Sequence, residues 1–383
     1  MIFASLIFLY LFLPLNLILY FTSNWLKKQK YTNLLNAKIF FNNLFCIFPS
    51  LCYNNMIIKD VPYFMTNSKI CGRFAPTPSG RIHLGNIFCS LLAWLHAKSQ
   101  DGEIVLRIED LDKVRCPRPN ADLLAKDLEW LGLTWDKGAY VDADSERYFQ
   151  SQRFDIYAEH FAKLEEQGLI YPCFCTRGQL HAAEAPHLSD GRILYSGTCK
   201  NLTASERLER AKTRQPAYRL SVNDKPICFT DGNYGEQSYN LMEESGDFIV
   251  RRSDGVYAYQ LAVTIDDALM GVTHVVRGCD LLSSTPMQIY IYKLLGFTPP
   301  EFLHIPLLMA PDGRRLAKRD KDLDLSMMRQ QYDSPEPIIG YLAYLAGQIP
   351  KAEPISTTEL AKIFKPELIP TDNIVVPPQL PEL

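Results

Sequence analysis

The sequence has little excess charge and no dense cysteine pattern. Its 40 lysines and arginines are offset by 43 aspartates and glutamates, which gives a formal net charge of −3. This balance argues against a generally basic coat for nucleic acid, although it is compatible with a local basic face. The 10 cysteines are scattered over 383 residues, whereas a disulfide framework needs a small, cysteine-dense secreted domain. We therefore expect an ordinary globular protein of a reducing compartment, located in the cytoplasm.

The first 64 residues lack three residue types that are common later in the chain. They contain no Gly, Arg or Glu, while Phe, Leu, Ile and Asn are abundant. Residues 2–22 are almost entirely apolar and precede Lys27, Lys28 and Lys30, so they could span a membrane with the remainder on the cytoplasmic side. A secretory signal peptide fits poorly, because no positive residue precedes the apolar run.

The abrupt change of composition favours another interpretation of this leader. Translation would begin at Met65, and residues 1–64 would be an over-extended start. We expect membrane contact only if residues 1–64 are translated.

The stretch from Arg73 to Asn86 combines a strand, a turn and the start of a helix. It reads Arg-Phe-Ala-Pro-Thr-Pro-Ser-Gly-Arg-Ile-His-Leu-Gly-Asn. Two prolines, a serine and a glycine break the strand, and apolar residues recur at helical spacing from His83 onward. Free N–H groups and the dipole at a helix N-terminus favour an anion. The stretch therefore predicts a phosphate site, where His83 supplies a donor and Gly85 lets a nucleotide ring approach the backbone.

This stretch resembles the HIGH signature of class I aminoacyl-tRNA synthetases, in the form used by the glutamyl branch. The resemblance runs from about Lys69 to about Ser326 and implies an α/β catalytic domain of Rossmann type. It implies that ATP is bound by His83, Gly85 and Asn86. The positions of the motif that would bind glutamate are Arg73, Ala75 and Thr77.

A second apolar run, residues 102–108, predicts a buried parallel strand that ends in acidic residues. Open α/β sheets place ligands at the carboxyl ends of their strands. Glu109 follows the run directly, and the resemblance places it against the amino group of the bound amino acid, a cation that a carboxylate suits. Two amphipathic helices are predicted next, over residues 120–134 and 146–168.

Three thiols, Cys173, Cys175 and Cys199, can hold a tetrahedral zinc if a fourth donor is available. The candidate donors by residue type are His181, His187 and Tyr195. Three unrelated buried thiols are the alternative. The segment resembles the zinc-binding insertion of glutamyl-queuosine tRNA(Asp) synthetases, whose Cys, Cys, Tyr and Cys ligands correspond to Cys173, Cys175, Tyr195 and Cys199. The resemblance implies a structural zinc, because four protein ligands leave no open position.

Residues 247–255 predict a hairpin, and residues 257–280 read as two β-type runs around a turn. Taken alone, Tyr259 would be a packed aromatic and Arg277 a partner in a surface ion pair. In glutamyl-type enzymes the matching Tyr and Arg bind the amino acid, and the planar Arg fork contacts its side-chain carboxylate. Ordinary glutamyl-tRNA synthetases usually carry Asn at the position of Gln260, so here the chain resembles the queuosine branch.

The stretch from Pro311 to Arg319 follows an apolar strand predicted over residues 303–309 and occupies the place of the KMSKS loop. Ala317 replaces the usual first Ser, and Arg319 replaces the usual last residue. Lys318 matches the lysine that stabilises the phosphates as pyrophosphate leaves. A local basic groove for tRNA could involve Arg314, Arg315 and Arg319.

The resemblance implies a class I catalytic domain split by a zinc-bearing insertion and followed by a short C-terminal helical extension. The expected segments are the leader 1–64, the catalytic halves 65–170 and 247–330, the insertion 171–246 and the extension 331–383. The extension contains a predicted helix at residues 338–345. We expect it to be too short for the anticodon-binding domain of an ordinary glutamyl-tRNA synthetase.

The implied reaction joins glutamate and Mg-ATP into glutamyl-adenylate and then transfers the glutamyl group to queuosine at the wobble position of tRNA(Asp). His83 and Lys318 would be catalytic by stabilising phosphate charge, and we expect a monomer. The alternatives are a truncated glutamyl-tRNA synthetase charging tRNA(Glu), a nucleotidyltransferase acting on another acid, and a non-catalytic tRNA-binding module. Gln260 counts against the truncated glutamyl-tRNA synthetase, and a nucleotidyltransferase acting on another acid does not predict Arg277. The non-catalytic module is disfavoured by the intact set of His83, Glu109, Arg277 and Lys318.

Overall fold

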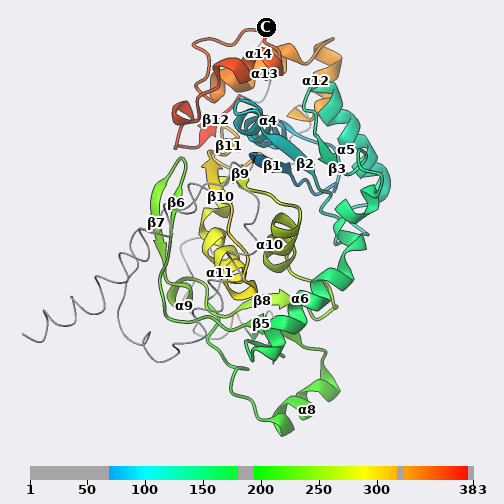
Figure 1. The fold of residues 1–383 in the computed structure, drawn as a ribbon, viewed down its shortest axis with the longest axis vertical. Coiled ribbons are helices and arrows are strands. Elements are labelled where there is room, and N and C mark those ends of the chain that lie inside the picture. Colours follow the sequence, from blue (N-terminus) through cyan, green and yellow to red (C-terminus); the bar gives the residue numbers. More distant parts are fainter. Residues whose placement is uncertain (1–68, 177, 180–193, 317–322, 378–383) are drawn as a thin grey trace, which may run out of the picture. The chain divides into compact units, whose positions relative to one another are not determined.

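The structure, a computed structural model, describes residues 69–176, 178–179, 194–316 and 323–377. They belong to one unit, Asn67–Leu383, whose elements are labelled in Figure 1. The predicted leader 1–64 lies outside the described residues, and so do His181, His187, Ala317, Lys318 and Arg319. Within the described ranges, no helix is both long and apolar enough to cross a membrane.

A small parallel sheet carries the first half of the predicted site. Its strands are β1 (Cys71–Phe74), β2 (Glu103–Leu106) and β3 (Lys137–Gly138), in the order β1-β2-β3. Parallel strands need crossover connections, and these contain α4 (Leu84–Lys98) and α5 (Arg118–Trp130). All four residues of β1 are buried. The buried parallel strand expected over residues 102–108 is confirmed as β2, which is shorter than expected and whose last three residues are buried.

A second sheet carries the other half of the site. Its strands are β7 (Gly235–Tyr239), β6 (Ile227–Asp231), β10 (Glu301–Ile305) and β9 (His274–Gly278), in that order. β10 runs parallel to β6 and β9, whereas β6 and β7 form an antiparallel hairpin. The connection from β9 to β10 contains the 3-10 helix η4 (Cys279–Ser284) and α11 (Thr285–Leu295).

The two sheets meet where β1 lies beside β9. The N–H of Thr273 donates to the carbonyl of Cys71 at 2.9 Å, and the Thr273 hydroxyl accepts from the N–H of Cys71 at 2.8 Å. On one side of this junction β1 pairs with β2, and on the other side β9 pairs with β10. Open α/β sheets bind ligands in the crevice at such a switch point, outside the carboxyl ends of the strands.

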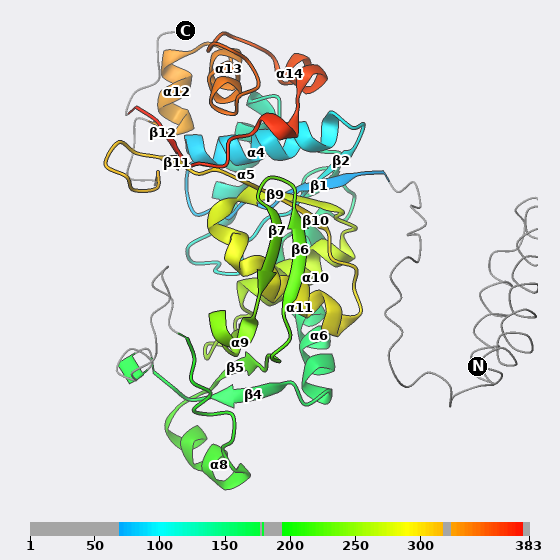
Figure 2. The same ribbon diagram turned by 90° about the vertical axis from the view of Figure 1, so that its left-hand side faces the viewer.

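An antiparallel sheet follows the first half of the catalytic fold. It consists of β4 (Ile170–Cys173), β5 (Ala217–Leu220) and β8 (Phe248–Arg251). Figures 1 and 2 show α8 (Ala204–Thr213) beyond this sheet, on the side away from β1. The short helix α9 (Leu241–Glu244) precedes β8.

The last described residues return to the first sheet. β11 (Leu308–Met309) pairs in parallel with β12 (Ile374–Val375). The helices between them are α12 (Leu325–Gln331), α13 (Glu336–Leu345), α14 (Thr357–Ile363) and the 3-10 helix η6 (Pro366–Leu368). α14 contacts α4. α13 confirms the helix expected at residues 338–345.

Two groups of buried apolar side chains surround the junction of the sheets. One includes residues of α4, β2, α13 and α14, and the other includes residues of α6 (Phe154–Glu166), β8 and α11. Val275 belongs to the second group and Val276 to the first. Successive side chains of a strand point to opposite faces, so β9 separates the two cores and brings Arg277 to the junction.

Three expectations about local structure need correction. The helix expected at 146–168 begins only at Phe154, after the 3-10 turns η2 (Ser145–Tyr148) and η3 (Gln150–Gln152). The strand expected at 303–309 is interrupted after Ile305, because Pro306 cannot donate a ladder hydrogen bond. The helix expected at 120–134 is displaced, since it ends at Trp130 and Gly132 follows with a φ of 72°.

The first of the two β-type runs in 257–280 is also wrong, because it forms α10 (Tyr259–Leu269). Residues 257–265 carry an aromatic or aliphatic residue at every second position, which is the period of a strand. In the fold this stretch is helical instead, and the consecutive residues 261–267 are all buried. The hairpin turn after β8 is confirmed, with the N–H of Arg252 donating to the carbonyl of Val256 at 2.8 Å and Gly255 at a φ of 86°.

Candidate active site

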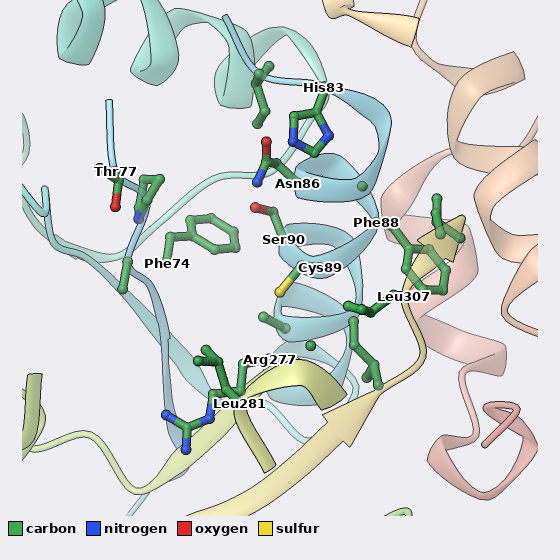
Figure 3. A pocket seen from close by; sticks show the side chains of 18 of the residues that line it. Phe74, Thr77, His83, Asn86, Phe88, Cys89, Ser90, Arg277, Leu281 and Leu307 are labelled. Carbon is green, nitrogen blue, oxygen red and sulfur yellow. The ribbon is translucent and has the colours of Figure 1, made fainter. Parts of the chain in front are cut away.

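A cavity of about 530 Å³ lies at the junction of β1 and β9. It is lined by every described residue that the sequence predicts for ATP or glutamate: Arg73, Ala75, Thr77, His83, Gly85, Asn86, Glu109, Tyr259 and Arg277. Figure 3 shows His83 and Asn86 towards one end of the cavity and Arg277 towards the other. Lys318, the remaining predicted residue, lies outside the described residues.

The N-terminus of α4 forms the end of the cavity that holds His83. His83 is the N-cap residue, and its carbonyl accepts from the N–H groups of Asn86 at 2.9 Å and Ile87 at 3.0 Å. A Cβ added to Gly85 would come within 3.2 Å of the His83 ring. Gly85 therefore leaves room for that ring, a role in addition to the nucleotide contact expected from the sequence.

The opposite end of the cavity holds Arg277, which is only 3% exposed. Its Nε donates to Nε2 of His304 at 3.0 Å, its Nη1 to Oε1 of Gln288 at 2.7 Å and its Nη2 to the hydroxyl of Thr285 at 2.8 Å. Burial lowers the pKa of Arg277, and the nearby Arg73 lowers it further. Among the residues that the structure describes, no carboxylate lies within ion-pair distance of this guanidinium.

Glu109 is held in a buried ion-pair network below the cavity. Nη2 of Arg107 donates to Glu109 at 3.1 Å, and Nη1 of the same residue donates to Asp267 at 2.5 Å. Asp267 also lies 3.4 Å from Nε of Arg73. Burial raises the pKa of Glu109, against the opposing effect of Arg107 and Arg73.

The network continues through Asp266, the neighbour of Asp267 on α10. Asp266 accepts from Nε of Arg153 at 2.7 Å, from the hydroxyl of Tyr157 at 2.9 Å and from the amide of Gln150 at 2.8 Å. It is fully buried. Because α10 begins at Tyr259, these contacts fix the helix that brings this tyrosine to the cavity, where 36% of its surface is exposed.

The described part of the predicted basic groove is paired with acids of the same chain. Arg315 forms an ion pair with Asp280, and both line the cavity. Nε of Arg314 donates to Asp312 at 2.7 Å. Such exposed pairs contribute little to stability.

The four predicted zinc ligands come together beside β4. The sulfur atoms of Cys173, Cys175 and Cys199 all lie within 4.8 Å of one another. Sγ of Cys175 is 3.6 Å from Sγ of Cys199, and Sγ of Cys173 is 3.5 Å from the hydroxyl of Tyr195. Ligands about 2.3 Å from a tetrahedral zinc would be about 3.8 Å apart, so this donor set fits the ion.

The residues that hold the site in place were not predicted from the sequence. They are Arg107, Asp231, Asp266, Asp267, Gln288 and His304, all at most 3% exposed. The two adjacent aspartates in the apolar run of α10 could have indicated the network, because buried carboxylates are normally paired. Asp231, Gln288 and His304 lie on other elements than Arg277 and carry no comparable signal.

A parallel sheet with a nucleotide-type cavity at its switch point and a HIGH-like turn before α4 defines a class I synthetase catalytic domain. A family model described as "tRNA synthetases class I (E and Q), catalytic domain" matches residues 69–374. The chain belongs to this family.

Similar proteins fall into two groups by name. The Glutamyl-Q tRNA(Asp) synthetase of Symbiobacterium thermophilum is 48% identical over 80% of this chain and 96% of its own length. A Glutamate–tRNA ligase of Sulfurihydrogenibium is 38% identical over 77% of this chain and 62% of its own length. A solved glutamate tRNA ligase of Elizabethkingia meningosepticum, in complex with its amino acid, superposes with a TM-score of 0.68 at 28% identity, covering 80% of this chain and 67% of that one.

Proposed function

We propose that the cavity binds glutamate and ATP and joins them into glutamyl-adenylate. The observation that supports this most is the charge arrangement, because Glu109 and Arg277 line one cavity and Arg277 has no carboxylate partner among the described residues. Glutamate offers an α-ammonium group to Glu109 and a side-chain carboxylate to the Arg277 fork. The other residues proposed to hold it are Arg73, Ala75, Thr77 and Tyr259.

ATP would lie at the N-terminus of α4, against His83, Gly85 and Asn86. An oxygen of the glutamate α-carboxylate attacks the α-phosphorus, and pyrophosphate leaves. This chemistry depends on positioning and on neutralising charge. We assign the charge neutralisation to His83 and Lys318, and Mg²⁺ enters with ATP.

The second proposed step transfers the glutamyl group from the adenylate to the cyclopentene ring of queuosine in tRNA(Asp), with AMP as the leaving group. It is supported by the names of the relatives from Symbiobacterium thermophilum and Nitratidesulfovibrio vulgaris, 48% and 45% identical, which are both Glutamyl-Q tRNA(Asp) synthetases. In each case the match covers 96% of the relative.

We further propose that Cys173, Cys175, Tyr195 and Cys199 hold a structural zinc. The three thiols and the phenol converge at distances that suit one tetrahedral ion. Cζ of Arg219 lies 3.6 Å from the centroid of the Tyr195 ring, so the guanidinium stacks on the ring and helps to hold the phenol in place. Zinc in this position would tie β4 to the segment before α8 and would take no part in the reaction.

Two assays test the function with the full chain. The first is ATP–pyrophosphate exchange with glutamate, glutamine or aspartate, and we expect exchange with glutamate only. The second is transfer of labelled glutamate to tRNA(Asp) with and without queuosine and to tRNA(Glu). Label on queuosine-containing tRNA(Asp) alone is the expected result. Label on tRNA(Glu) would establish the glutamate–tRNA ligase activity instead, and no exchange by folded protein would refute the activation step.

A further inference from the structure

Arg277 is held on both sides by side chains that the proposed reaction does not use. A guanidinium has five N–H donors and no acceptor. Three of the five are occupied, by His304, Gln288 and Thr285. One N–H therefore remains on each terminal nitrogen, Nη1 and Nη2. Two such donors are what a carboxylate accepts with its two oxygens.

The histidine beside Arg277 has a defined tautomer. Nε2 of His304 faces Nε of Arg277 at 3.0 Å, and because an arginine can only donate, Nε2 must be the acceptor. Nδ1 of His304 lies 2.5 Å from Oδ2 of Asp231 and so carries the proton. His304 is therefore neutral, and Asp231, at the end of β6, fixes the orientation of its ring.

The glutamine on the other side has a defined amide orientation for the same reason. Oε1 of Gln288 accepts from Nη1 of Arg277 at 2.7 Å, so its Nε2 points the other way and donates to Oε1 of Gln260 at 2.8 Å. Amide orientations follow from such networks, and here the arginine decides it. The Nε2 hydrogens of Gln260 have no partner among the described residues.

The chain of five residues Asp231, His304, Arg277, Gln288 and Gln260 is here named the donor relay. Donation runs outward from Arg277 on both sides, through His304 to Asp231 and through Gln288 to Gln260. His304, Gln288 and Thr285 each accept one N–H group of Arg277. Asp231, Gln288 and His304 are at most 2% exposed, so water cannot readily replace these contacts. A ligand group at this end of the cavity therefore meets the two remaining N–H donors of Arg277.

We propose that Asp231, His304 and Gln288 are positioning residues that make the site select a side-chain carboxylate over a carboxamide. Glutamate offers two acceptors to the two remaining N–H groups. Glutamine offers one acceptor and an NH₂ donor, so one of the two remaining N–H groups of Arg277 would face a donor instead of an acceptor. A buried mismatch of this kind is costly because the polar groups stay unpaired. This inference rests on the proposed activation of glutamate.

The sharpest test is Gln288→Glu, which keeps the shape of the side chain. The introduced carboxylate still accepts from Arg277, but it also neutralises the guanidinium and cannot donate to Gln260. The Gln260 amide is then expected to turn, so that its NH₂ group donates to the new carboxylate. In pyrophosphate exchange we expect the KM for glutamate to rise and the preference for glutamate over glutamine in kcat/KM to fall about tenfold or more. The KM for ATP should stay unchanged.

A buried glutamine far from the cavity provides the matched control. The amide of Gln348, 8% exposed, also uses both ends, accepting from the N–H of Lys365 at 2.9 Å and donating to the carbonyl of Ala346 at 2.9 Å. Gln348→Glu makes the same chemical change and should leave the preference for glutamate within twofold of the original protein. An equal loss of preference in both variants would overturn the relay.

The histidine is tested by a pair of variants with the same two measurements. In His304→Gln, the new amide oxygen can still accept from Arg277. We therefore expect the KM for glutamate to rise less in His304→Gln than in His304→Leu, and kcat of His304→Gln to change little. The leucine variant can fail to fold, and in that case Gln288→Glu alone decides. Glutamate exchange with an unchanged preference in Gln288→Glu would overturn the relay only, whereas no glutamate exchange by the unmodified protein would overturn the proposed function.

Discussion

Glu109→Gln separates recognition of the amino group from everything else in the cavity. The side chain of Glu109 is only 9% exposed and lines the cavity next to Arg73. The variant keeps an oxygen that can accept from Arg107 but loses the charge proposed to bind the ammonium group of glutamate. A hydrogen bond to a charged group contributes about 1.5–3 kcal/mol, and about 1.4 kcal/mol corresponds to a factor of ten. We therefore expect the KM for glutamate to rise about 10-fold to 100-fold.

The ion-pair network explains why this variant should stay folded. Three buried arginines, Arg73, Arg107 and Arg153, face three carboxylates, those of Glu109, Asp266 and Asp267. Removing the charge of Glu109 leaves Arg107 with its 2.5 Å contact to Asp267 and a second carboxylate, Asp266, at 3.7 Å. No arginine of the network loses its last anionic partner, which is the case that destabilises most.

The neighbouring carboxylate Asp110 is the control. It is 8% exposed, accepts from the N–H and hydroxyl of Ser151 at 2.8 and 2.7 Å, and does not line the cavity. Asp110→Asn should lower the melting temperature without changing the KM for glutamate by more than about twofold. Pyrophosphate exchange at varied glutamate and varied ATP measures both constants. The assignment would be refuted if Glu109→Gln left the KM for glutamate unchanged, or if it raised the KM for ATP as much as the KM for glutamate.

Two further predictions concern the thiols and a buried histidine. Cys199→Ser should abolish zinc binding, measured by metal analysis of the purified protein, and lower the melting temperature by about 5 °C or more. The control Cys228→Ser, at an exposed thiol, should keep the metal. Equal zinc content in the two variants would contradict the site. Burial lowers the pKa of His96 to about 4, with His274 as the second cause, and the unfolded pKa is about 6.5. The stabilising effect of its neutral form is therefore complete above pH 6.5 and is lost as the pH falls towards 4. Urea unfolding at pH 7.5 and 5.0 should show a loss that is about 2 kcal/mol smaller in His96→Gln than in the original protein, and identical losses would argue against the shift.

The local order of the site was predictable because it depends on short-range signals. Prolines and glycine between an apolar strand and a helical pattern place the turn before His83, and the structure confirms β1 and α4 there. The position of Glu109 was predictable because it directly follows an apolar run, although β2 itself ends at Leu106, and its role was expected from the resemblance. The sequence pattern failed for α10, because aromatic and aliphatic residues at every second position of 257–265 imitate a strand, whereas tertiary packing buries the segment as a helix.

The convergence of these segments could be expected from the resemblance, but their support could not. Tyr259 and Arg277 carry no pattern that distinguishes them from a packed aromatic and a surface ion pair. The structure shows that Arg277 is buried and bonded to His304, Gln288 and Thr285. It also shows the paired Arg107 and the two aspartates beneath Glu109, none of which the sequence analysis singled out.

The sequence by itself determined the class of the catalytic domain through its resemblance to a known signature, and it also determined the residue types available at each end of the cavity. The turn before α4 is encoded over a few consecutive residues, through backbone preferences and hydrophobic period. Only the tertiary structure decided which donors of Arg277 remain for a ligand, because its partners come from β10 and α11, and Asp231 from β6. Hydrogen-bond direction in a buried network depends on contacts between distant segments, and no local pattern in the chain records them.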